Sequence, residues 1–487
     1  MEKKLTQIKS KSLASVVSLL AQGSYSAALG FAAFFILTVK SGAYLLGIYN
    51  TVLATLSSFN YFTNLGLAAA IMQKKDVRQI DLNSAFYIQF FLTIVAVIIG
   101  FMMTPLVFSF YKDLPSNTVS LYWAVLISFF FLSLKSIPSV LLEKKIEIYK
   151  VVVVQAIENT VFYLTVIILV LLGYTIESLI IAVMARAITG LILMYILNPW
   201  FPTLSFSWDS AKSLLKYGIP FQGNSFLALI KDDLLIIYLG GTIGLTNLGY
   251  VTFAKKYAEF SIRLIMDNVN RVGFPLFVTF QNDKKLLKKA LQKVYFYESL
   301  LIIPAVMGAL FIFDVILKIV PGDYYQKWHL ALVSFYFFSL SSFFVALYSP
   351  LINFFNAIGR VKTSVAFMVY FTAFTWLSIP IAIKVFDFNG ISIAFFIMSL
   401  SYILVVRKAQ QYIKFSLFNF IKYPLLGGFS MMLFLVILRF IFFKLFLPEY
   451  FYLFFALVGG ATVYFMMLYK FIGRKLFTDV TDIFYKK

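Results

Sequence analysis

Residues 249–264, GYVTFAKKYAEFSIRL, place charged side chains inside an otherwise apolar segment. The charges alternate in sign at every fourth position, and this spacing continues past the segment. The series is Lys255, Glu259, Arg263, Asp267 and Arg271, with Lys256 beside the first charge. Charges in an apolar span are costly, so they usually face the interior of a helix bundle or a water-filled cavity. The segment therefore predicts a membrane protein with a polar interior, which favours transport.

The composition indicates membrane spans along the whole chain. Of 487 residues, 61% are hydrophobic and 13% are charged, whereas soluble proteins have about 45–50% apolar and about 25% charged residues. Apolar runs predict fourteen spans, the first too long for the apolar core of a signal peptide. These spans are residues 13–39, 44–72, 84–111, 119–142, 151–172, 176–197, 217–239, 248–265, 295–317, 328–352, 363–385, 390–406, 421–441 and 450–469.

The distribution of cations predicts the orientation of these spans. A net charge of +21 would suggest nucleic-acid binding in a soluble protein. Here, with a cytoplasmic N-terminus, the even-numbered connections and both tails hold about 28 Lys and Arg residues and the opposite connections about 7. The positive-inside rule therefore places both termini in the cytoplasm. The charge is thus explained by topology and by attraction to anionic membrane lipids, with no nucleic-acid partner.

Short matches at a common offset of about 200 residues predict two parallel repeats. Lys11-Ser12 recurs as Lys212-Ser213, Gln22-Gly23 as Gln222-Gly223, and Leu46-Gly47-Ile48-Tyr49 resembles Leu248-Gly249-Tyr250. Both copies begin on the cytoplasmic side, as in transporters with parallel repeats. The predicted divisions are an N-terminal lobe at 1–198, a cytoplasmic amphipathic linker at 199–216, a C-terminal lobe at 217–418, and two additional spans with a cytoplasmic tail at 419–487.

Charged residues of two consecutive spans are predicted to lie at the same membrane depth. At 1.5 Å per residue, Lys231 lies roughly 21 Å above the cytoplasmic end of its span, and Lys255 roughly 11 Å below the outer end of the next. In a core of about 30 Å these depths nearly coincide. We therefore predict that Lys231, Asp232 and Asp233 meet Lys255 and Lys256 in a cationic site for an anionic substrate. The alternative is a structural ion-pair cluster, because buried ion pairs often cost as much as they return.

The other intramembrane polar residues are weaker candidates. Glu259 would tune the charge of this site, and Arg263 would lie at its cytoplasmic mouth, whereas Asp267 and Arg271 fit an exposed helical extension. In the first lobe, Glu158 and Arg186 are predicted to pair across two spans. Three amides of the first lobe are candidate substrate contacts or, alternatively, contacts between helices. They are Gln22, Asn60 and Asn64.

Catalysis is not predicted. The sequence has no cysteine and a single histidine, His329, at a loop–helix junction. It shows no phosphate-binding loop, nucleophile elbow, zinc-protease or EF-hand pattern. The predicted outer loops are also too short for an extracytoplasmic catalytic domain. We therefore expect no enzyme, no metal site and no cofactor, with H⁺ or Na⁺ as candidate coupling ions through Asp232, Asp233, Glu259 or Glu158.

Two segments carry a family resemblance. Leu46 to Gln73 (LGIYN…NYFTNLGLAAAIMQ) and Asp232 to Tyr257 (DDLLIIYLGG…LGYVTFAKKY) resemble the Wzx-type polysaccharide flippases. Their superfamily also includes drug/cation antiporters and lipid II flippases. The resemblance implies an all-α integral membrane fold of two parallel six-helix lobes around a central cavity, with two appended helices. It also implies that an undecaprenyl-diphosphate-linked oligosaccharide crosses the bacterial cytoplasmic membrane, with the polysaccharide polymerase and chain-length machinery as candidate partners.

The residues suit a flippase better than two alternatives. A lipid diphosphate would be bound by Lys231, Lys255, Lys256 and Arg263 of the second lobe and Arg186 of the first. A cation-coupled multidrug exporter of the same fold would instead need acidic residues to dominate its cavity. A membrane polymerase or ligase would need a sizeable outer loop. Lipid II flippases keep arginines in their first two spans, where this chain has only amides.

Overall fold

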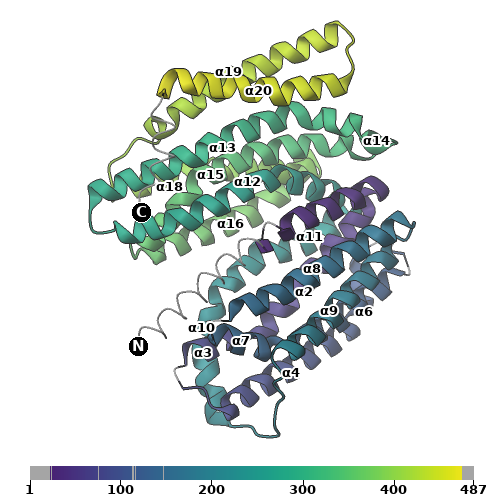
Figure 1. The fold of residues 1–487 in the computed structure, drawn as a ribbon. Helices are drawn as coiled ribbons and strands as arrows, with labels where there is room; N and C mark the ends of the chain where they lie inside the picture. Colours follow the sequence, from purple (N-terminus) through teal and green to yellow (C-terminus); the bar gives the residue numbers. More distant parts are fainter. Residues whose placement is uncertain are drawn as a thin grey trace. The chain divides into compact units, whose positions relative to one another are not determined.

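The computed structural model describes residues 22–23, 25–74, 76–111, 114–115, 117–145 and 147–473. Within these ranges it leaves out the side chains at 56, 59, 60, 62–64, 220, 221, 223–225, 228, 261 and 472. All regular elements of the described residues are helices (Figure 1), which confirms the predicted all-α fold class. The chain divides into two compact units, Met1–Gly249 and Tyr250–Lys487.

The first unit contains the helices from Tyr25 to the start of α12. Apolar side chains of α3, α4 and α7 pack in one of its cores, together with Trp200 and Leu214. The helices are Tyr25–Lys40, α2 (Ala43–Asn64), α3 (Leu67–Gln73), α4 (Gln79–Met102), α5 (Thr104–Phe110), α6 (Asn117–Leu134), α7 (Ser136–Lys144), α8 (Ile148–Leu171), α9 (Ile176–Leu197), α10 (Trp208–Lys231) and α11 (Asp233–Ile243).

A proline accounts for the interruption between α6 and α7. Pro138 has no N–H group, so it cannot donate to the carbonyl oxygen of Leu134, four residues earlier. That oxygen accepts a hydrogen bond from the Tyr195 hydroxyl instead, at 3.2 Å. The helix is interrupted at the intervening residue, Lys135, which lies between the two segments. Lys135, a charged residue in the middle of an apolar run, therefore lies at the junction between α6 and α7.

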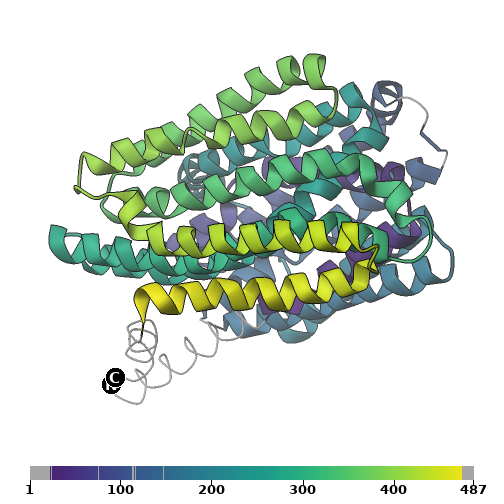
Figure 2. The same cartoon turned by 90° about the horizontal axis from the view of Figure 1, so that it is seen from above.

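The second unit contains long helices and a pair of appended spans. Figure 2 shows α19 and α20 running side by side. Its elements are α12 (Leu245–Thr279, of which the first turn belongs to the first unit), α13 (Lys284–Ile319), α14 (Tyr324–Trp328), η1 (His329–Ala331), α15 (Leu332–Ala357), α16 (Val361–Phe386), α17 (Asn389–Ser399), α18 (Tyr402–Gln410), α19 (Leu417–Lys444) and α20 (Glu449–Ile472).

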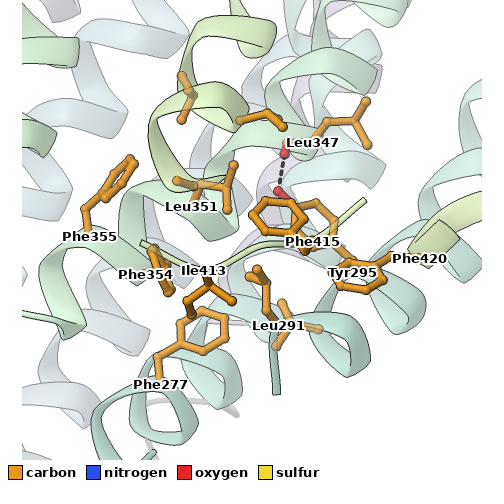
Figure 3. Packing of buried hydrophobic residues seen from close by; sticks show 14 of the residues in the cluster. Phe277, Leu291, Tyr295, Leu347, Leu351, Phe354, Phe355, Ile413, Phe415 and Phe420 are labelled. Atoms are coloured by element: carbon orange, nitrogen blue, oxygen red, sulfur yellow. Dashed lines mark hydrogen bonds between the residues drawn. The ribbon is translucent and has the colours of Figure 1, made fainter. Parts of the chain in front are cut away.

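A core of this unit forms where α12, α13, α15 and the start of α19 meet (Figure 3). Aromatic rings fill it, among them Phe277, Phe354 and Phe420. Tyr295 is buried in the same cluster, and its hydroxyl donates to the carbonyl oxygen of Leu347 at 2.5 Å. A buried hydroxyl without a partner would be costly, so this bond lets a tyrosine occupy an apolar core.

An ion-pair network attaches the appended helices to α13. Arg439 of α19 donates to Asp314 of α13 at 2.6 Å and to Glu449 of α20 at 3.2 Å. Lys318, one turn beyond Asp314, lies 3.6 Å from Asp314 and 3.5 Å from Glu449. The Arg439 guanidinium also stacks over the ring of Tyr452, 4.9 Å from its centroid. Two carboxylates shared by two cations thus connect three helices at one end of the unit.

The structure and the apolar runs agree on most spans. Ten helices of the described residues are long and apolar enough to cross a membrane, so the predicted count of fourteen is not confirmed. The ten correspond to the predicted spans 84–197 and 295–469. One span, Ile176–Leu197, has the predicted bounds. The other four predicted spans are 13–39, 44–72, 217–239 and 248–265.

The segment predicted as a linker between lobes has a different structure. Residues 208–216 are the first turns of α10, which continues to Lys231, and do not form a separate surface helix. Residues of this segment bind the start of α4: Asn83 donates to Thr203, and the Ser210 hydroxyl donates to the buried Asp81, each at 2.6 Å. The compact units also place 217–249 with the first unit. The predicted lobe boundaries stay a prediction.

Candidate functional site

Lys231, Asp232 and Asp233 lie at an interruption of a predicted span. Lys231 is the last residue of α10, and Asp233 is the first of α11. The Lys231 ammonium contacts the Asp232 carboxylate at 3.2 Å, and these side chains are 32% and 50% exposed. Asp233 lies in the first turn of α11, where the helix dipole stabilises a negative charge. Interrupted membrane helices commonly carry substrate or ion sites.

The charged series that follows lies along the single helix α12 but has several environments. The Lys255 ammonium lies 4.7 Å from the centroid of the Phe395 ring. Arg263 donates to Glu259 at 2.7 Å, and the Arg263 side chain is 68% exposed. Asp267 and Arg271 are exposed farther along the same helix, as predicted for an extension. The series is therefore not one uniform polar stripe.

The two groups belong to different compact units. Lys231–Asp233 lie in Met1–Gly249, and the residues from Lys255 to Arg263 lie in Tyr250–Lys487. The contacts described above are therefore contacts within one unit or within the other. Their meeting at mid-membrane stays a prediction.

A third charged group lies inside the first unit. One of its members, Lys135, was not predicted as a site residue from the sequence. Lys135, at the break between α6 and α7, forms an ion pair with Glu158 of α8. Glu158 is 2% exposed, and Gly190 of α9 makes room for its carboxylate, because a Cβ there would lie 2.8 Å from Glu158 Cγ and overlap the carboxylate. The structure thus pairs Glu158 with Lys135 in place of the predicted Arg186.

Arg186 lies on α9 and faces an aromatic ring. Its Cζ lies 5.8 Å from the centroid of Phe162, and its Nε has no hydrogen-bond partner among the described residues. A cation over a ring face is stabilised electrostatically, but an N–H group remains for a ligand. The signal for Lys135 was present in the sequence, since a lysine precedes a proline by three positions inside an apolar run.

Only one of the three candidate amides can be placed. Gln22 donates to the Ser26 hydroxyl at 3.2 Å, and Asn159 donates to the same oxygen at 3.0 Å. Asn159 is the residue after Glu158 on α8, so these contacts tie the first helix to α8 one position from the buried carboxylate in sequence. The side chains of Asn60 and Asn64 lie outside the described residues.

The candidate residues are unevenly distributed over the predicted spans. Glu158 and Arg186 lie on α8 and α9, which are apolar enough to cross a membrane. All the others lie in the four predicted spans without a counterpart among the ten apolar helices of the described residues. Those spans are the first two of each predicted repeat. No group of three or more metal-ligating side chains occurs in the described part of the chain.

Comparisons with known proteins agree on a membrane transporter. The model of a family described as "Polysaccharide biosynthesis protein" matches residues 45–332. A lipopolysaccharide biosynthesis protein of Escherichia coli (strain K12), WzxC, is 21% identical over 381 residues, covering 74% of each chain. Among solved structures, the lipid II flippase MurJ in an inward closed conformation matches with a TM-score of 0.74 and 15% identity, over 95% of this chain and 100% of that one. An inward-facing multidrug resistance transporter of the MATE family matches with a TM-score of 0.62 and 13% identity, over 82% and 98%.

Proposed function

Because the chain belongs to the family of polysaccharide biosynthesis proteins, we propose that it is a flippase for surface polysaccharide synthesis. It moves undecaprenyl-diphosphate-linked oligosaccharide units from the cytoplasmic to the outer leaflet of the bacterial cytoplasmic membrane. The likeness to a lipopolysaccharide biosynthesis protein and the fold shared with a lipid II flippase support transport over catalysis. The polysaccharide polymerase and the chain-length machinery are its proposed partners.

One observation carries this proposal: the polar candidate residues gather in the first two spans of each predicted repeat. Polar side chains in a membrane are tolerated where they face a bundle interior or water. A polar interior built from equivalent spans of two halves suits a substrate whose oligosaccharide must cross the hydrocarbon core, with the lobes opening alternately to each side.

The cations suit the diphosphate. Among the described residues Lys255 makes no ion pair, and Lys256 places a second positive charge beside it. In a low-dielectric interior each attraction to a phosphate oxygen is much stronger than in water. Within the same set, Lys231 and Arg263 are each paired with a carboxylate. Lys255 is therefore the principal diphosphate ligand in this proposal, with Lys256 as its neighbour in sequence, and the paired cations have supporting roles.

The acidic candidates can be ranked for ion coupling in the same way. Asp232, Glu259 and Glu158 each form an ion pair with a neighbouring cation. Asp233 forms none among the described residues. A carboxylate without a cationic partner is the more available to bind H⁺ or Na⁺. We therefore assign the coupling role to Asp233.

The double variant Lys255→Gln/Lys256→Gln tests the diphosphate site. We expect at least about a tenfold loss of polysaccharide export, equivalent to about 1.4 kcal/mol, with unchanged membrane insertion. Export would be measured in a strain that lacks its own flippase and is supplied with a matching glycan pathway. The control is Lys284→Gln/Lys285→Gln, which removes the same charge from exposed positions in the first turn of α13. Wild-type export by the first variant would remove the site. Drug resistance without glycan export would favour the multidrug exporter.

The proposed orientation can be tested with single cysteines, because the sequence has none of its own. We expect Lys285→Cys, in the first turn of α13, to react only with reagents that reach the cytoplasm. Tyr174→Cys, in the turn between α8 and α9, should react with an impermeant maleimide added to whole cells. A reporter fused after Lys487 should likewise be active in the cytoplasm. The opposite labelling pattern would overturn the orientation without affecting the flippase proposal.

A further inference from the structure

A groove opens between α15, α18 and α19 of the second unit, and none of the charged residues described above lines it (helices labelled in Figure 1). Its volume is about 400 Å³. The walls are apolar and include Phe344 of α15, Ile403 of α18 and Leu425 of α19. Arg407 and Gln410 are its two lining residues with polar side-chain groups other than the tyrosine hydroxyl. The lining of α18 runs from Tyr402 to Gln410 and that of α19 from Leu417 to Leu425. Each spans eight helical steps, or about 12 Å at 1.5 Å per residue.

The local sequence explains why the groove is present. Serine hydroxyls bond to carbonyl oxygens of the preceding turn at the end of α17: Ser399 to Phe396 at 2.6 Å, and Ser401 to Met398. Such bonds compete with the helical ladder, and α18 begins anew at Tyr402. The Tyr402 ring then stacks on Phe344, with 5.2 Å between centroids. This contact packs α18 against α15 and gives the groove an aromatic wall.

The groove is polar at one end only. Arg407 and Gln410 belong to the last turns of α18, and the lining residues toward Tyr402 and Leu425 are apolar. Gln410 is held in place, because its amide donates to the carbonyl oxygen of Phe415 at 2.9 Å. Ile403, at the groove, is 44% exposed. An apolar, exposed rim of this kind is stable facing hydrocarbon.

Arg407 has no carboxylate partner among the described residues, and its surroundings are cationic. None of the three lining helices contains an Asp or Glu residue. The same region contributes Lys408, Lys414 and Lys422. An arginine guanidinium matches a phosphate in geometry and charge and binds it with two parallel hydrogen bonds. The polar end of the groove is therefore positively charged and, among the described residues, has no carboxylate that neutralises Arg407.

We propose that this groove binds one anionic phospholipid of the surrounding membrane. An acyl chain lies against Phe344, Tyr402 and Leu425, and the phosphate accepts hydrogen bonds from Arg407. The volume lies within the range of about 300–1,000 Å³ typical of small-ligand sites, which is enough for a lipid chain but not for another helix. A free phosphate ion would leave the apolar walls uncovered. The proposal does not depend on the flippase function, since lipid binding is measured without substrate.

Binding would be measured on the purified full-length protein by native mass spectrometry with phosphatidylglycerol or phosphatidylcholine. We expect the wild type to prefer phosphatidylglycerol by at least about tenfold, as one charge-assisted contact can supply. Arg407→Gln should lose that preference. Lys408→Gln, the matched control, removes one charge from the next position, which does not line the groove, and should keep it. Ile403→Trp should fill the groove and reduce binding of both lipids.

Several results would overturn the proposal. Equal phosphatidylglycerol binding by Arg407→Gln and the wild type would do so, as would equal losses in Arg407→Gln and Lys408→Gln, which would indicate only general attraction between charges. Displacement of bound phosphatidylglycerol by undecaprenyl phosphate would assign the groove to the isoprenoid chain of the substrate. Melting temperatures without added lipid should match the wild type, so a folding defect is detected separately.

Discussion

Replacing Gly47 with leucine is expected to destabilise the protein by about 3 kcal/mol, the upper end of the usual cost of overpacking, and to abolish export. Gly47 lies where α2 crosses the first turn of α12. A Cβ at this position would overlap the carbonyl oxygen of Leu245, with the carbonyl carbon only 2.7 Å away. Both atoms belong to backbone, so no rotamer change can relieve the overlap. The two helices would have to separate, which the melting temperature in detergent and the export assay would both detect.

The crossing is reciprocal, and this gives a sharper test. A Cβ at Gly249 would overlap the carbonyl oxygen of Ala43, with its carbon at 2.5 Å. Gly249 follows Gly47, and Leu245 follows Ala43, at the same offset of 202 positions. Gly47→Ala and Gly249→Ala should therefore have similar effects. The double variant should be destabilised by less than the sum of the two single variants. Once one Cβ has separated the helices, the second Cβ no longer overlaps the facing backbone.

Gly42→Ala is the matched control for this prediction. Gly42 precedes α2 with an ordinary φ of −89°, and a Cβ there has no atom within 4 Å. Its replacement should leave the melting temperature and export near wild type. If Gly42→Ala and Gly47→Ala were equally damaging, flexibility at the start of α2 and not close helix packing would explain both. Small residues that let backbones approach are a common means of packing membrane helices.

The apolar runs predicted the spans well where sequence and packing agree. The predicted bounds of Ile176–Leu197 match α9, because Gly173 and Tyr174 make a turn before it and Asn198-Pro199 ends it. Hydropathy did not predict the helix end where a helix continues beyond its apolar segment. The helix α12 continues to Thr279, well past the predicted end at 265, since backbone hydrogen bonds do not depend on the polarity of the side chains.

The charged groups could be predicted as a set but not as pairs. Glu158 was predicted to lie within a membrane span, and Arg186 was chosen as its partner from the neighbouring span. The actual partner, Lys135, comes from a different helix and depends on the break that Pro138 introduces. Which cation reaches a carboxylate is decided by helix rotation and crossing, and sequence spacing within one span does not contain that information.

The Lys135–Glu158 pair leads to the second large prediction. Lys135→Met should destabilise the protein by about 3–5 kcal/mol, because it leaves a carboxylate buried without its cation. Adding Glu158→Gln should recover much of that loss, since a neutral amide costs far less to bury than an unpaired charge. Gly190→Ala should also destabilise the protein, because the added Cβ would displace the Glu158 carboxylate. Chemical unfolding of the purified variants in detergent would measure all three.

Two controls separate this pair from ordinary ion pairs and from the predicted alternative. Lys150→Met breaks the Lys150–Glu147 pair, which has an N–O distance of 2.7 Å and side chains 30% and 20% exposed. It should cost less than about 1 kcal/mol, as more exposed pairs do. Arg186→Gln should also cost little, because Arg186 contacts a ring and not Glu158. If Arg186→Gln were as damaging as Lys135→Met, the predicted Glu158–Arg186 pairing would be the correct one. If Lys135→Met were no worse than Lys150→Met, the buried carboxylate would not depend on its lysine, and the prediction would be wrong.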